Sequence, residues 1–385
     1  MTASARGSLW PALAVAALAA ALAWFAGGQA MLGRIDPALA LPLLVPPLAL
    51  LAWWRRDDAA PARWRAFLIA LLSLAAIQCL LTLLLAHALD GGGVALVAVA
   101  GAATAWLCDA IVRWRRRAAL RVAALLLLAV GWFAAGHAAL ALLYRPAFRA
   151  AAPATMLTGL PLRWAGGGGI AAMIADGSQD DPALRAIEAA LPVRLVDSLV
   201  DHPPPPGGAL LLAHPRALAP RELVAIDAFV RGGGRAVVLA DALSGWPPAH
   251  PLGDPRNPPV TSLLTPLLDH WGVTLDAAPP GDRAARPVDV DGARLRLFSA
   301  GRFARLPPGC RSFADARVAA CPIGRGQAWL VGDADLLFAP LWQPVPRWAA
   351  HLRKADTIEW IAARLAGRDD AQGWLRPLWI RPAAG

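Results

Sequence analysis

Residues 210–244 read LLLAHPRALAPRELVAIDAFVRGGGRAVVLADALS. The apolar run at 209–213 predicts a buried strand, and a second such run follows at 235–240 after three glycines. Between them, apolar residues recur on one face at helical spacing, which predicts an amphipathic helix over 221–231. A strand, a helix and a second strand in this order indicate a parallel βαβ arrangement.

The same alternation continues on both sides of this stretch. We expect further strands at 169–175, 193–196 and 327–332, and further helices at 182–191, 263–271 and 355–366. The pattern predicts an α/β domain over 170–366, with a mostly parallel, Rossmann-like sheet and helices on both faces. A Pro/Gly-rich linker is expected at 146–169 and a Trp-containing tail at 367–385.

The first part of the chain has a different composition. Of the 385 residues, 57% are apolar, well above the 45–50% of a typical soluble domain, which excludes a disordered chain and argues against a purely soluble enzyme. The excess lies in five runs, each long enough to cross a hydrocarbon core of ~30 Å as a helix. We therefore predict a transmembrane region over 1–145, with helices at about 9–26, 38–54, 66–89, 94–112 and 119–144. Prolines in the second run predict a kinked or re-entrant segment there.

The loops between these runs differ sharply in charge. The N-terminus and the loops near 55–65 and 113–121 carry ten arginines, whereas the loops at 27–37 and 90–93 carry only Arg34. Positively charged loops stay in the cytoplasm. We expect a bacterial inner-membrane protein with a cytoplasmic N-terminus and a periplasmic α/β domain. The net charge of +10 thus orients the chain in the lipid bilayer, and no nucleic acid is expected as a partner.

Three predicted strands are followed by an aspartate, namely Asp176, Asp241 and Asp333. Ligands of open α/β sheets bind beyond the carboxyl ends of the strands. These side chains are therefore candidates for binding a ligand, a cation or a basic partner. The alternative is that each aspartate caps the turn or helix that follows it.

Sequence motifs of catalysis are missing. There is no G-x-S-x-G elbow, no P-loop, no H-E-x-x-H and no C-x-x-C, so we expect no catalytic residue, no metal site and no cofactor. The sequence favours a non-catalytic protein whose α/β domain binds a partner or ligand. The alternative is an envelope hydrolase or amidotransferase-like enzyme with a non-standard site.

Cys310 and Cys321 are the two cysteines outside the apolar runs. If the α/β domain lies outside the cytoplasm, both face an oxidising compartment, which favours a disulfide between them. Two buried free thiols are the alternative.

The stretch 210–244 is followed by SLLTPLLDHWGVTLD at 262–276 and GRGQAWLVGDADLL at 324–337. This order resembles the extracytoplasmic domain of the auxiliary proteins of uncharacterised ABC-type transport systems, a group that includes the gliding-motility auxiliary component. The resemblance covers about 170–340. It implies a flavodoxin-like or class-I glutamine-amidotransferase-like fold without the catalytic Cys, and an ABC permease and ATPase as partners. Those auxiliaries usually have fewer N-terminal helices, and often one after the domain.

Overall fold

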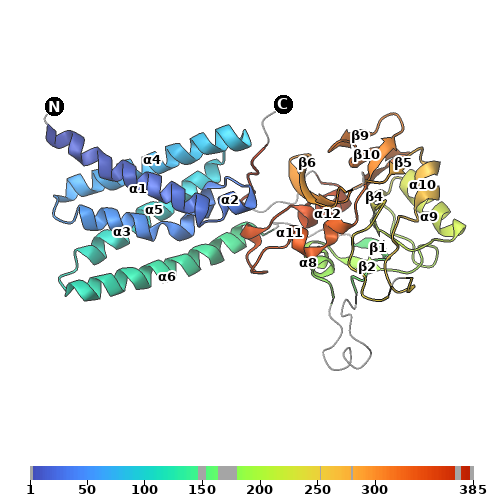
Figure 1. The fold of residues 1–385 in the computed structure, drawn as a ribbon, viewed down its shortest axis with the longest axis horizontal. Coiled ribbons are helices and arrows are strands. Elements are labelled where there is room, and N and C mark those ends of the chain that lie inside the picture. The colour runs from blue at the N-terminus through green and yellow to red at the C-terminus, as the bar shows by residue number, and fades with distance from the viewer. Residues whose placement is uncertain are drawn as a thin grey trace, which may run out of the picture. The chain divides into compact units, whose positions relative to one another are not determined.

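The computed structural model describes residues 3–145, 153–163, 180–251, 253–278, 281–368 and 374–381. The chain divides into two compact units, a helical unit and an α/β unit. The helical unit contains the N-terminal helices together with two short segments from much later in the chain, 344–353 and 374–381. The α/β unit contains the remaining described residues (Figure 1).

The helical unit begins with the apolar runs that the sequence predicts. Its elements are α1 (Ala3–Phe25), α2 (Gln29–Leu32), η1 (Pro37–Leu43), α3 (Val45–Trp54), α4 (Ala60–Ala86), α5 (Gly91–Val112) and α6 (Ala118–Leu143). Among the described residues, four helical stretches are long and apolar enough to cross a membrane, or five if the bent pair η1 and α3 forms one span. The prediction of about five apolar spans is thereby confirmed.

The second span is bent, as its prolines predict. Its two parts, η1 and α3, meet at an angle of 61°. Three contacts place this pair against α6 and the residue that follows it: Asp36 with Tyr144, Leu41 with Trp132, and Trp53 with Arg121. Residue numbers increase along the bent pair from one contact to the next, while the residue numbers of their partners decrease along α6. The pair therefore extends antiparallel to α6 along nearly its whole length and does not turn back halfway.

A buried ion pair joins distant parts of the helical unit. Arg34, the lone arginine of the Arg-poor loops, is fully buried and pairs with Asp36. The Arg34 guanidinium donates to the backbone carbonyl of His351 at 2.6 Å. The guanidinium carbon of Arg34, Cζ, lies 5.2 Å from the centre of the Trp379 ring. The Asp36 carboxylate also accepts a hydrogen bond from the backbone of Leu378. One ion pair thus connects the helix ends to both returning segments.

The main sheet of the α/β unit has seven strands in the order β2-β1-β3-β4-β11-β10-β9. Their bounds are β1 (Ala154–Thr158), β2 (Val193–Leu195), β3 (Ala209–Ala213), β4 (Arg235–Leu239), β9 (Arg311–Phe313), β10 (Val318–Ile323) and β11 (Gly326–Val331). The first five strands in that order are parallel, and β10 and β9 are antiparallel. The run 2-1-3-4 is the beginning of the flavodoxin-like strand order.

Helices cover both faces of this sheet. Successive residues of a strand point to opposite faces, and in β3 Leu211 packs in one buried cluster while Leu210 and Leu212 pack in another. The first cluster includes α8 (Pro182–Ala190) and α12 (Thr357–Ala366), and the second includes α9 (Pro220–Arg231) and α10 (Thr265–His270). The predicted fold class, apolar helices followed by a mostly parallel α/β sheet, is confirmed.

The remaining elements are short. They form two two-stranded sheets, β5 (Thr274–Asp276) with β8 (Arg302–Arg305) and β6 (Ala285–Val290) with β7 (Ala293–Phe298), and the turns η2 (Asp335–Leu337), α11 (Ala339–Trp342) and η3 (Ala350–Leu352).

Two stretches belong to a part of the structure other than the domain or linker that the sequence predicts for them. Strand β1 lies inside the predicted 146–169 linker, and residues 344–353 of the predicted α/β domain belong to the helical unit. The strand predicted at 169–175 lies outside the described residues.

Substitutions at Arg34 and Asp36 test how much this buried ion pair contributes to the stability of the helical unit. Asp36→Ala leaves the buried Arg34 charge without its partner, and we expect a loss of about 3–5 kcal/mol of stability. The double variant Arg34→Met with Asp36→Leu removes both charges, so its loss should be clearly smaller. Asp57→Ala, at an exposed ion pair with Arg56, is the matched control and should change little.

Thermal unfolding in detergent measures all three variants. Equal losses for the single and double variants would contradict the role given to the ion pair.

Candidate functional site

Two aspartates predicted from the sequence come together at one edge of the main sheet. Strands β4 and β11 are parallel neighbours, so their carboxyl ends meet, and Asp241 and Asp333 each lie two residues beyond a strand end. Asp335, the first residue of η2, joins them. Carboxylate oxygens of the three side chains lie within 4.8 Å of one another. All three aspartates are buried.

The surrounding loops donate hydrogen bonds to this carboxylate cluster, as we call Asp241, Asp333 and Asp335. Asp241 accepts from the backbone of Leu243 and Ala334, Asp335 from the Ser244 hydroxyl and the backbone of Gly245, and Asp333 from the backbone of Phe298. One oxygen of Asp333 is buried and accepts no hydrogen bond. Among the described residues, no basic side chain forms an ion pair with any of the three.

Burial changes how these groups titrate. Desolvation, with a smaller contribution from the Asp335 charge, raises the pKa of Asp241 to about 7. Desolvation and then the charges of Asp241 and Asp335 raise the pKa of Asp333 well above its ordinary value, and burial also raises the pKa of Asp335. Three buried carboxyls without a counter-charge cannot all be ionised at low cost. The carboxylate cluster therefore holds protons near neutral pH.

Carboxylate oxygens are also the ligands that Mg²⁺ and Ca²⁺ prefer. The hydrogen bonds to Asp241 and Asp335 reach both oxygens of each side chain, whereas one buried oxygen of Asp333 accepts none. The capping role weighed as the alternative is present at Asp241, which accepts from the backbone two residues further along. A ligand at these aspartates stays a prediction, and Asp176 lies outside the described residues.

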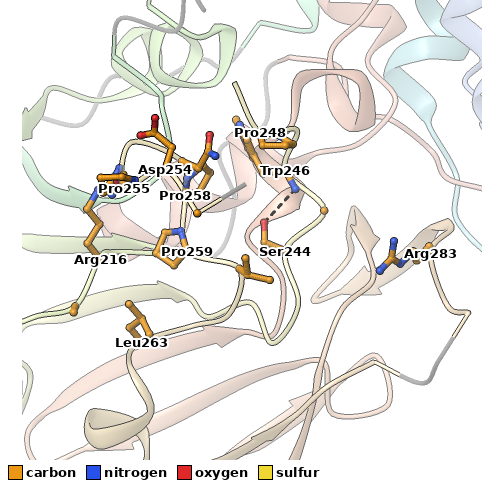
Figure 2. Close-up of a pocket in the computed structure, with 15 residues that line it drawn as sticks. Arg216, Ser244, Trp246, Pro248, Asp254, Pro255, Pro258, Pro259, Leu263 and Arg283 are labelled. Atoms are coloured by element: carbon orange, nitrogen blue, oxygen red, sulfur yellow. Dashed lines mark hydrogen bonds between the residues drawn. The ribbon is translucent and has the colours of Figure 1, made fainter. Parts of the chain in front are cut away.

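A pocket of about 720 Å³ lies beside the carboxylate cluster, a volume within the range of small-molecule sites. Ser244 links the two, because its hydroxyl donates to Asp335 at 2.9 Å while the residue lines the pocket. Arg216 and Arg283 lie on opposite sides of it (Figure 2). The remaining lining is Ala217, Gly245, Trp246, Pro248, Gly253, Asp254, Pro255, Asn257, Pro258, Pro259, Val260 and Leu263.

The residues that follow β3 hold one wall of this pocket. The buried ring of His214 places Nε2 2.8 Å from the carbonyl oxygen of Pro259. The Arg216 guanidinium donates to the carbonyl oxygens of Pro255 and Arg256. Desolvation lowers the pKa of His214, so its ring is neutral at physiological pH. These hydrogen bonds from side chains to backbone carbonyls hold segment 255–259 against the sheet. No sequence motif marks them.

The pocket lining combines apolar surface with positive charge. Its described residues include no histidine and no cysteine. Ser244, the lining hydroxyl, donates to Asp335, a carboxyl whose pKa is raised, which does not make a serine nucleophilic in the way that a neighbouring imidazole does. Proline and Trp246 side chains supply apolar surface, and the arginines supply positive charge.

Cys310 and Cys321 are joined by a disulfide in the structure. Cys310 lies just before β9, and Cys321 lies within β10. Cys79 and Cys108, in the apolar helices, are free. The pairing is the one favoured by the sequence, and the bond in the cell stays a prediction because it depends on the compartment.

Residues 157–291 match a family model described as an ABC-type uncharacterized transport system. The matched stretch extends from β1 to the turn between β6 and β7, and it contains Asp241 and every residue that lines the pocket. It does not include Asp333 or Asp335. No curated protein matches this chain.

Three solved glycosidase structures share a distant likeness to the chain. They are the exo-β-1,4-mannosidase Op5Man5 from Opitutaceae bacterium strain TAV5 (12% identity, TM-score 0.29, 48% of this chain and 32% of that chain), a cold-adapted β-galactosidase from Rahnella sp. R3 (15%, 0.28, 60% and 36%), and a catalytic mutant of Gan42B, a GH42 β-galactosidase from G. stearothermophilus (15%, 0.28, 63% and 31%). The match spans about a third of each enzyme's length, and similarity at this level indicates no shared activity.

The raised pKa of Asp241 predicts how stability depends on pH. In the unfolded chain this carboxyl has a pKa of about 3.9, whereas in the folded chain it is about 7. The stability that its protonated form contributes is therefore complete below about pH 4 and is lost as the pH rises to about 7. Asp241→Asn keeps a neutral side chain at every pH.

Thermal unfolding of both proteins from pH 4 to 8, with EDTA present, tests this. The melting temperature of Asp241→Asn minus that of the parent should rise between pH 4 and 7 and stay constant above. Asp201→Asn, on an exposed residue, controls for the loss of one charge. Parallel curves for parent and Asp241→Asn would contradict the burial argument.

Proposed function

We propose that this chain is an auxiliary component of an ABC-type transport system. Five spans anchor it in the bacterial inner membrane, and its α/β domain lies in the periplasm, where it binds a partner or ligand without catalysing a reaction. The observation that carries the proposal is the family match over 157–291, because it coincides with the part of the chain that forms the pocket.

The charges of the helical unit support this placement. Ten arginines lie at or near one set of helix ends. The opposite ends carry Arg145, two residues after α6, and Arg34, whose charge is buried against Asp36. The bent pair η1 and α3 extends along nearly the whole of α6, so it counts as a crossing. Five crossings put the end of α6 on the side opposite the N-terminus, and arginine-rich loops favour the cytoplasmic side.

The pocket supports a binding role. It lies beyond the carboxyl ends of β3 and β4, where open α/β sheets bind ligands. Arg283 is exposed, and its side chain forms no ion pair or hydrogen bond with any described residue. Facing the prolines and Trp246 across the pocket, it suits a polypeptide segment of a permease that combines apolar side chains with a carboxylate.

Affinity purification of the full chain in a mild detergent tests the proposal. We expect an ABC permease and its ATPase to copurify. Val260→Trp, at an exposed position in the pocket lining, should fill the pocket and lower permease recovery by about tenfold or more. Val224→Trp, at an equally exposed position on α9 outside the pocket, is the matched control and should leave recovery unchanged.

Two results would contradict the proposal. Purification without any transport subunit, even after crosslinking in intact cells, would exclude the auxiliary role. Equal permease recovery with Val260→Trp and Val224→Trp would exclude the pocket as the binding site.

A further inference from the structure

Segment 344–353, PVPRWAAHLR, leaves the α/β unit between α11 and α12 and belongs to the helical unit. Its anchor is His351, whose Nε2 lies 2.8 Å from Nδ1 of His137 on α6. The backbone carbonyl of His351 accepts the hydrogen bond from Arg34. Leu352 packs against a buried apolar cluster that includes Leu140 of α6. The segment is therefore fixed to α6 by polar and apolar contacts.

These contacts set the depth that the segment reaches along α6. His137 lies six residues before Leu143, the end of the helix, which at 1.5 Å per residue is about 9 Å from that end. None of the most apolar stretch of α6 is buried within the protein, so α6 is the least buried of the candidate spans. This unburied stretch ends at Ala135, before the buried Gly136. A segment that touches His137 therefore adjoins the end of this unburied surface and lies below the level of the helix end.

The free side of the segment has the composition of a membrane interface. Val345 is 80% exposed and Trp348 is 54% exposed, and Arg347 between them is also exposed. Tryptophan is enriched where the acyl chains meet the headgroups, and arginine reaches from there to phosphate groups while its stem stays in an apolar environment. Met31 and Trp374, on neighbouring parts of the same unit, are also largely exposed.

We propose that segment 344–353 is a membrane-interface anchor and that the phospholipid bilayer covers Val345 and Trp348. The position next to the end of the unburied surface of α6, the depth set by His137 and the pairing of tryptophan with arginine all favour lipid over a protein partner. The anchor gives the region between α11 and α12 its own attachment to the bilayer. It goes beyond the transport role and does not depend on any partner subunit.

Lipid quenching of a label on Val345→Cys tests this anchor. The full chain is labelled with an NBD probe, without reductant, and reconstituted alone into vesicles of phosphatidylcholine and phosphatidylglycerol. Lipids that carry a nitroxide near the headgroup end of the acyl chain should quench the NBD fluorescence. Quenching by aqueous iodide should be several-fold weaker than for the control label. Val224→Cys, a valine of similar exposure on α9, is the matched control and should show the reverse pattern.

The unsubstituted chain, labelled in parallel, corrects for any reaction at Cys79 and Cys108. Trp348→Cys provides a second probe of the same surface if Val345→Cys reconstitutes poorly, and it should give the same pattern. Iodide quenching of both segment labels as strong as that of Val224→Cys, with no quenching by nitroxide lipid, would overturn the anchor. Because the vesicles contain no transport subunits, this result is independent of the test of the auxiliary role.

Discussion

A hydrocarbon layer tolerates neither an unpaired backbone group nor an isolated charge, and this constraint governs the first 145 residues of the chain. It requires the apolar runs to be helical and keeps the arginines at the helix ends. Arginines buried in this region have a counter-charge, which is Asp109 for Arg63 and Asp36 for Arg34. That pair in turn draws in the backbone of His351 and Leu378, so residues more than 300 positions apart share one polar centre.

The elements set by local pattern could be predicted from the sequence. Strands β3 and β4, helix α9 and the bend between η1 and α3 follow from apolar periodicity, glycine and proline. Strand β1 could not, because ATMLT at 154–158 is a short run inside a proline-rich and alanine-rich stretch. Nor does any local signal show that β10 and β9 join the sheet in the antiparallel direction, since this depends on pairing with β11.

In the candidate site too, some residues could be predicted from local sequence and others could not. Asp241 and Asp333 could be predicted because parallel neighbouring strands bring their carboxyl ends together. Asp335 was missed, although it lies two residues after Asp333, because the turn that directs it towards Asp241 is set by tertiary packing around η2. The pocket was missed because its walls are irregular loops, held by backbone contacts from His214 and Arg216.

The proposed function depends on which side of the bilayer the sheet occupies, because the disulfide and the access of a permease to the pocket follow from that location. Labelling of single cysteines with a membrane-impermeant maleimide in spheroplasts measures this most directly. The proposed periplasmic location predicts that Val224→Cys, exposed on α9, reacts in intact spheroplasts, and that Asp57→Cys, exposed in an arginine-rich loop, reacts only after permeabilisation. The opposite pattern would contradict it.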